Sequence, residues 1–63
     1  MATIEEIEDM LGDEFPKDVK GDDYYEKEFL IIMNGTLAQY GEAWVREHKT
    51  MLNSQWECVR TLV

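Results

Sequence analysis

The clearest pattern in the chain is an apolar stripe in its last third. Side chains that are apolar or carry rings recur there at spacings of three, four and seven residues, as on one face of an amphipathic helix. Charged side chains fall on the opposite side, and Glu42 and Arg46 have the spacing of an i, i+4 ion pair. The pattern predicts a helix over residues 42–62. The stripe consists of Trp44, His48, Met51, Leu52, Trp56, Val59, Leu62 and Val63.

A second helix is predicted near the start of the chain. Thr3 and Glu6 have the spacing of a capping box, in which each side chain accepts a hydrogen bond from the backbone N–H of the other. Apolar residues recur at helical spacing from Ile4 to Leu11, and Gly12 is suited to the C-terminal cap. These signals predict a helix over residues 4–11.

The periodicity is lost between residues 13 and 21. Pro16 disfavours a helical conformation for the residue before it. Phe15 and Val19 are the apolar side chains that can anchor this segment to a core. The segment is therefore predicted to be a connector.

A third helical pattern begins at Asp22 or Asp23. Either aspartate can cap a helix, because a short side-chain oxygen accepts from the exposed N–H groups of the first turn. Tyr25, Phe29 and Met33 then follow at i, i+4 intervals. A helix over residues 23–33 is predicted.

The Asn34-Gly35 pair that follows has two interpretations. Between apolar segments, an Asn-Gly pair is typical of a tight β-hairpin turn. Thr36 and Gln39, however, have the spacing of a new helix cap, and the residues after the pair favour helix. We favour helix, turn, helix, and keep the β-hairpin as the alternative.

These elements predict a mainly α protein. Helices near residues 4–11, 23–33 and 37–62 would form a small bundle or helical hairpin of about three helices, and the alternative is an α+β fold with a short hairpin around Asn34-Gly35. The chain has 63 residues and begins with Met1, so we expect a complete short gene product folded as a single domain, residues 1–63. Chains of this size bury a small core, which favours support from a partner or a second copy.

The charge of the chain is concentrated in one half. Residues 1–28 hold eleven acidic residues and three lysines, whereas residues 29–63 hold three residues of each sign, and the whole chain carries a net charge of −8. The chain thus has an acidic N-terminal half (1–28) and a neutral, apolar half (29–63). Direct binding to nucleic acid is disfavoured, because it relies on Lys and Arg to neutralise phosphates. A basic protein is the expected partner.

Candidate catalytic and metal-binding residues are few. Cys58 is the only cysteine and His48 the only histidine, whereas a zinc site needs about four convergent ligands. On one helix these two residues would lie about 15 Å apart along the axis, beyond the reach of a nucleophile and its base. The sequence therefore predicts no catalytic site, no metal and no cofactor, and a protein that is not an enzyme.

The same residues bear on localisation. One unpaired cysteine fits a reducing compartment. Residues 1–6 lack the basic and apolar regions of a signal peptide, and the longest strongly apolar run, Phe29 to Met33, is too short to cross a bilayer. We expect no membrane association and a cytoplasmic protein, in the host cytoplasm if it is viral.

The acidic half supplies the first functional hypothesis. A row of carboxylates four residues apart on one helix is slightly destabilising, so stability does not explain it. Such a surface could occupy a basic groove that normally holds DNA or RNA, as small acidic inhibitors made by phages do. The predicted function is a phage-type counter-defence inhibitor that mimics nucleic acid and blocks a nucleic-acid-binding enzyme. The predicted acidic face comprises Glu5, Glu8, Asp9, Asp13, Asp22 and Asp23.

The alternative hypothesis uses the apolar half. A chain this short covers large aromatic and Met side chains with difficulty, and such residues are enriched at protein interfaces. The protein would then be a structural or assembly subunit of a viral or multi-protein complex, or a homodimer, joined through its C-terminal helix. The predicted apolar face comprises Trp44, Met51, Trp56 and Val59.

Overall fold

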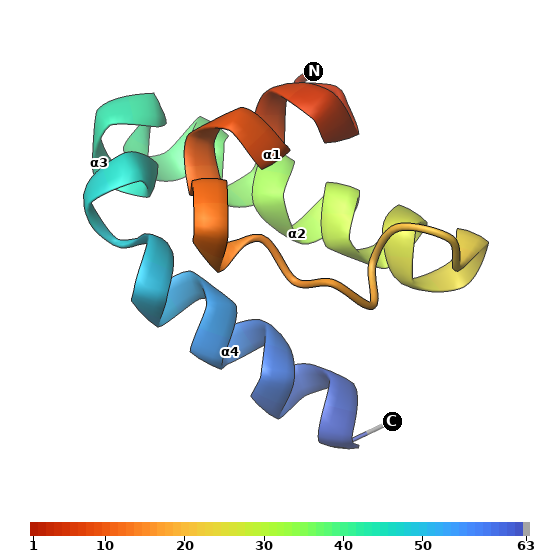
Figure 1. Cartoon of the computed structure of the whole chain (residues 1–63). Coiled ribbons are helices and arrows are strands. Elements are labelled where there is room, and N and C mark those ends of the chain that lie inside the picture. The colour runs from red at the N-terminus through yellow and green to blue at the C-terminus, as the bar shows by residue number, and fades with distance from the viewer. Residues whose placement is uncertain (63) are drawn as a thin grey trace.

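A computed structural model describes residues 1–62 of the chain, with side chains described for residues 1–61. The mainly α prediction is confirmed: the described residues form four α-helices and a 3-10 turn, with no strand. The elements are α1 (Ile4–Leu11), the 3-10 turn η1 (Gly12–Glu14), α2 (Asp23–Tyr40), α3 (Glu42–Glu47) and α4 (Lys49–Leu62). In Figure 1, α2 runs along the molecule with α1 above it and α4 below it, and α3 closes one end.

The first helix begins and ends as its sequence signals predict. The Thr3 hydroxyl accepts from the Glu6 N–H, and the Glu6 carboxylate accepts from the Thr3 N–H at 2.9 Å. Gly12 ends the helix with a φ of 54°, a left-handed conformation that glycine adopts without strain. Ile7 and Leu11 are buried on the inner side of the helix.

Two apolar residues anchor the connector to the core, as the sequence predicts. Phe15 and Val19 are both buried, and the Phe15 ring meets the Phe29 ring edge to face at 5.5 Å between centroids. The choice of cap for α2 is also settled, because Asp22 accepts from the Tyr25 N–H at 3.1 Å. The helix therefore starts at Asp23.

The predicted turn at Asn34-Gly35 is wrong, and so is the β-hairpin alternative. Both residues lie inside α2, which continues without a break to Tyr40 instead of ending near residue 33. Continuing the helix keeps Phe29 and Met33 in the core and packs Leu37 against it. The burial of these residues at helical spacing therefore outweighs the local preference of Asn34-Gly35 for a turn.

The Asn34 side chain has a different role from a turn. Its Oδ1 accepts from the Ala2 N–H at 2.7 Å, and its Nδ2 donates to the carbonyl oxygens of Ala2 and Leu30 at 3.2 and 2.9 Å. The amide therefore attaches the N-terminal segment to the middle of α2.

Replacing Asn34 with alanine is expected to lower the free energy of unfolding by about 1–2 kcal/mol, because the part-buried backbone groups of Ala2 lose their partners. Alanine is the better helix former, so a loss can come only from these hydrogen bonds. Urea unfolding followed by circular dichroism measures the change. The control is Gln39→Ala on an exposed position of the same helix, expected to stay within about 0.5 kcal/mol of wild type. Equal stability of the two variants would contradict this role for Asn34.

The helix predicted over residues 42–62 begins and ends at those residues, but it is divided in two at His48, and the start near residue 37 in the three-helix prediction is wrong. Gly41, with a φ of 96°, separates α2 from α3, and His48, with φ −112° and ψ 24°, separates α3 from α4. The bend at His48 turns both short segments toward the same core: Val45 is fully buried from α3, and Leu52 and Trp56 are buried from α4. Val45 comes three residues before His48 and seven before Leu52, so helical spacing places it on the same face as the predicted stripe, although the stripe did not include it.

One core joins all of these elements. Its buried side chains come from α1, the connector, α2, α3 and α4, so no helix is stabilised alone. The core residues are Ile7, Met10, Leu11, Phe15, Val19, Phe29, Met33, Val45, Leu52 and Trp56.

Candidate partner-binding surface

An acidic cluster lies where the connector crosses between α1 and α2. The Lys20 ammonium group donates to a Glu8 carboxylate oxygen at 2.7 Å. The pKa of Lys20 is raised, first by this hydrogen bond and then by the negative charges of Glu8, Glu5 and Glu26. Three carboxylates therefore surround one lysine, and the cluster as a whole stays negative. We call Glu5, Glu8 and Glu26 the Lys20 cluster.

Two arginines neutralise acidic residues elsewhere. Arg46 on α3 donates to Glu42 at 2.9 Å and to Asp9 on α1 at 3.1 Å, and these bonds raise the pKa of Arg46. The Glu42–Arg46 pair predicted from its spacing is present. Arg46 therefore links α3 to α1, and Asp9 is part of that link.

The second arginine holds the connector against α4. Arg60 donates to Asp18 at 2.9 Å and also pairs with Glu57, and the hydrogen bond to Glu57 is the first cause of its raised pKa. The Trp56 indole N–H points to the other Asp18 oxygen at 3.4 Å. These contacts serve the fold and leave little negative charge available on that side.

Most carboxylates remain without a cationic partner. Five of the fourteen acidic residues take part in ion pairs within the described part of the chain, which leaves nine, and eight of those nine lie in residues 1–28. The acidic imbalance seen in the sequence is therefore not cancelled by folding. The nine are Glu5, Glu6, Asp13, Glu14, Asp22, Asp23, Glu26, Glu28 and Glu47.

The predicted acidic face divides into several places. Glu5 and Glu8 lie together in the Lys20 cluster, whereas Asp9 is engaged by Arg46. Asp13 lies beyond α1 on η1, in a shallow hollow that Lys17 also lines.

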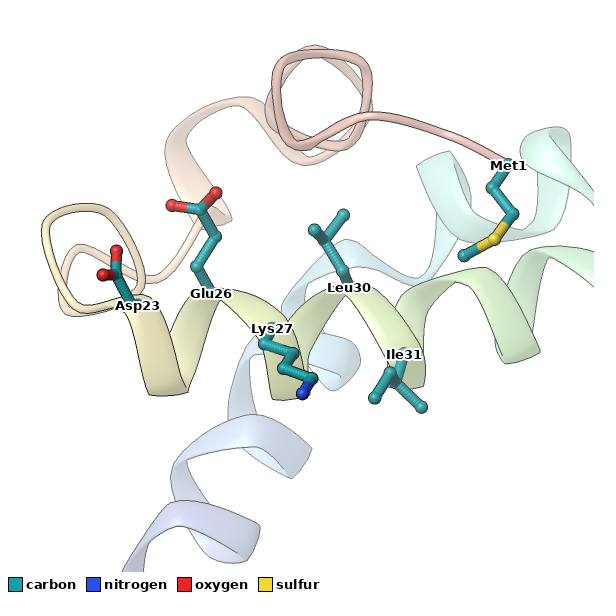
Figure 2. A pocket seen from close by; sticks show the side chains of 6 residues that line it. All are labelled: Met1, Asp23, Glu26, Lys27, Leu30 and Ile31. Atoms are coloured by element: carbon teal, nitrogen blue, oxygen red, sulfur yellow. The ribbon is translucent and has the colours of Figure 1, made fainter.

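The two aspartates at the start of α2 have separate roles. Asp22 uses its side chain as the cap of α2, whereas Asp23 remains exposed. Figure 2 shows Asp23 and Glu26 along one groove beside α2, with Leu30 on its floor and Met1 at its far end. Asp23 is therefore the member of this pair that a partner can reach without disturbing the helix start.

Sequence analysis missed Glu26 as a surface residue of this site. Asp22 is the cap of α2, so Glu26 has no capping role at this helix start. Glu26 faces α1 instead, as Figure 2 shows, and adds its charge to the Lys20 cluster. Only the path of the connector, which places Lys20 beside α1, brings these groups together.

The predicted apolar face is largely used by the fold. Trp56 is 4% exposed, and its ring meets the rings of Phe29 and Tyr25 edge to face. Trp44 is half-buried and stacks between Tyr40 and His48, with both centroid distances at 4.0 Å. The two other members, Met51 and Val59, are exposed on α4. The structure therefore does not gather the four residues on one open surface.

The His48 ring is placed by the bend between α3 and α4. Its Nδ1 lies 2.8 Å from the Trp44 carbonyl oxygen, and the ring packs flat on the indole. Cys58 is exposed farther along α4. Within residues 1–62, no three His, Cys, Asp or Glu side chains converge as metal ligands would.

No known protein family, curated protein or solved structure matches this chain. None of the helices in the described residues has both the length and the apolar character needed to cross a bilayer. The charged and apolar surfaces described above are the observations on which a function can be proposed.

Proposed function

We propose that this protein is a protein-binding module that inhibits a nucleic-acid-handling enzyme by occupying its basic groove. The observation that carries the proposal is the set of unneutralised carboxylates on α1, η1 and the first turns of α2. A groove lined with Lys and Arg is the complementary surface. Charges of opposite sign speed the encounter of two proteins and disfavour wrong partners.

The geometry of α1 supports this proposal. Glu5 and Asp9 lie about 6 Å apart along the helix axis, and Asp13 continues the acidic surface onto η1. Like charges at this spacing destabilise a helix by a few tenths of a kcal/mol. Asp9 is held by Arg46, so Glu5 and Asp13 are the charges of this row that remain available for binding.

The C-terminal half of the chain has far fewer free carboxylates than the N-terminal half. Residues 29–63 contain only three acidic residues, and two of them, Glu42 and Glu57, are paired with arginines. A basic partner therefore gains most from the side that carries α1, η1 and the start of α2. The assembly-subunit hypothesis has less support, because its central residue, Trp56, is in the core.

The test uses a variant that spares the structural ion pairs. Glu5, Asp13 and Asp23 are exposed and form no ion pair, so replacing all three with lysine leaves the links through Lys20, Arg46 and Arg60 in place. Immobilised wild-type protein is exposed to cell lysate, and captured proteins are eluted with a salt gradient and identified. We expect nucleic-acid-binding proteins, released at moderate salt because exposed charge pairs are screened. The triple variant should bind on the order of 100-fold more weakly.

A matched pair of single variants controls for net charge. Glu5→Lys and Glu47→Lys each change the charge by two units at an exposed position, but only Glu5 lies on the proposed surface. Weaker capture with Glu5→Lys alone supports the proposal. Capture that is unchanged in the triple variant, or that does not respond to salt, contradicts it.

A further inference from the structure

The outward side of α2 is apolar, although it faces away from the core. Tyr24 and Ile31 expose 55% and 57% of their surface, and Ile32 is exposed beside them. A surface helix normally carries polar residues on its outer side, and a helix that is apolar on all sides is normally covered on all sides. Within the described chain, α1, α3 and α4 leave this side of α2 open.

Four exposed residues and the half-buried Glu28 follow the spacing of a helix-pairing seam. Steps of four, three, four and three residues separate successive members, as in the a and d positions of paired helices. Two of the positions are small residues, which allow another helix to approach closely. We call the seam, with its neighbour Ile32, the α2 outer face. The seam consists of Tyr24, Glu28, Ile31, Gly35 and Ala38.

Gly35 is an independent observation that points to a partner. Glycine in the middle of a helix is less stable than alanine. Nothing within this chain requires it, because a Cβ at position 35 would meet no atom within 4 Å and the backbone there is helical. A closely packed helix from another molecule is an arrangement in which a side chain at this position would be in the way.

We propose that the α2 outer face binds a second copy of this chain, with the two α2 helices antiparallel. A pairing centred between Glu28 and Ile31 places the Tyr24 ring of each copy over Gly35 of the other. The large ring then fills the space that the missing side chain leaves. The antiparallel orientation is also the one in which the contact is the same from both sides, as a two-fold dimer requires.

The charge distribution favours a second copy over a basic partner on this face. From Phe29 to Gly41 the chain has no charged residue. Lys27 and Glu28, of opposite signs, precede this stretch, and Glu42, which is paired with Arg46, follows it. Two copies can therefore meet here although each carries a net charge of −8. An antiparallel pair also keeps the two acidic helix starts at Asp22 and Asp23 at opposite ends. A basic protein would find no carboxylates along most of this face.

The face runs along most of the length of the molecule. An 18-residue helix is about 27 Å long, which matches the 28 Å longest extent of the molecule. Standard interfaces bury about 800 Å² on each partner, which is about a fifth of the 4269 Å² surface of this chain. The exposed Val59 on α4 extends the apolar area, because it lines a small hollow together with Tyr24 and Ile32.

The first test is the mass of the full chain in solution, by sedimentation from about 1 μM to about 1 mM. We expect twice the 7.4 kDa of one chain at the upper concentrations, in high salt as well as low. Ile31→Glu should weaken the dimer about 100-fold, since the pairing places each new carboxylate opposite Glu28 of the other copy, at the centre of the contact. Because Ile31 is exposed in the single chain, circular dichroism should show an unchanged fold.

The matched control is Met51→Glu, which introduces the same charge at an exposed apolar residue on α4. It should leave the dimer intact. Gly35→Ala should affect the monomer and the dimer in opposite directions. The melting temperature of the monomer at low concentration should rise, and the dimer should become about tenfold weaker. A monomer at all concentrations overturns the proposal. So does a dimer that Ile31→Glu leaves intact or that Met51→Glu dissociates. None of these results depends on the binding of a basic partner, whose test is capture through the acidic side.

Discussion

Replacing Phe29 with alanine is expected to remove much of the stability of the protein. Phe29 is 1% exposed, and its ring meets Phe15 from the connector and Trp56 from α4, with centroids 5.5 and 5.2 Å away. Truncating a buried phenylalanine to alanine costs about 3–5 kcal/mol. A domain of 63 residues has a total stability of about 3–9 kcal/mol, so this single change removes much of it.

Urea unfolding of wild type and variant measures this loss. Phe29→Leu keeps most of the buried volume and should cost less than Phe29→Ala, whereas Ile31→Ala on the exposed side of the same helix should change the stability of the monomer by about 0.5 kcal/mol or less. The expected order is therefore Ile31→Ala, then Phe29→Leu, then Phe29→Ala. Unfolding of Phe29→Ala at the same urea concentration as wild type would show that Phe29 does not join the three segments.

Trp56→Ala is expected to be nearly as damaging, again by about 3–5 kcal/mol. The indole packs between Phe29 and Tyr25, and its N–H points to Asp18 in the connector. Its removal frees α4 from both α2 and the connector. Loss of a cooperative transition in circular dichroism is the expected result, and Trp56→Phe should retain a transition at lower stability. A cooperative transition of Trp56→Ala at wild-type stability would contradict the core described here.

This expectation changes how an interface on α4 can be tested. A loss of assembly in Trp56→Ala would report unfolding, because the residue supports the core. Met51 and Val59 are the residues of the predicted apolar face that can be changed without opening the core. Substitutions at these two positions are therefore the informative ones for that hypothesis.

The sequence predicts helix starts well where the signal is local. The Thr3–Glu6 capping box and the Asp22 cap act within a few residues of the chain, and both are present. Asn34-Gly35 shows the limit of such signals. Its turn preference is also local, but burial of Met33 and the bonds from Asn34 to Ala2, 32 residues away, decide the outcome.

The bend at His48 could not be predicted for a related reason. Nothing in the residues around His48 breaks a helix, and the apolar stripe runs across it. The bend follows from packing, because it lets Val45 reach the core from α3 while Trp56 reaches it from α4. Periodicity within one helix carries no information about a change of direction that other segments impose.

The sequence predicts that the surface is acidic, but it does not predict how the acidic residues are arranged on it. The excess of carboxylates in residues 1–28 is visible in the sequence, and folding leaves most of them unpaired. The engagement of Asp9 by Arg46, and the approach of Glu26 to Lys20, depend on how α3 and the connector pass α1. The fold therefore decides which acidic residues a partner can reach.

The measurement that most directly tests the proposed function is competition for the groove of a partner recovered by capture. A fluorescently labelled DNA duplex is bound to that purified partner, and this protein is added while the anisotropy of the DNA is followed. We expect that wild-type protein releases the DNA and that the variant with lysine at positions 5, 13 and 23 does not. Anisotropy that stays high while both the DNA and this protein are bound to the partner would contradict it.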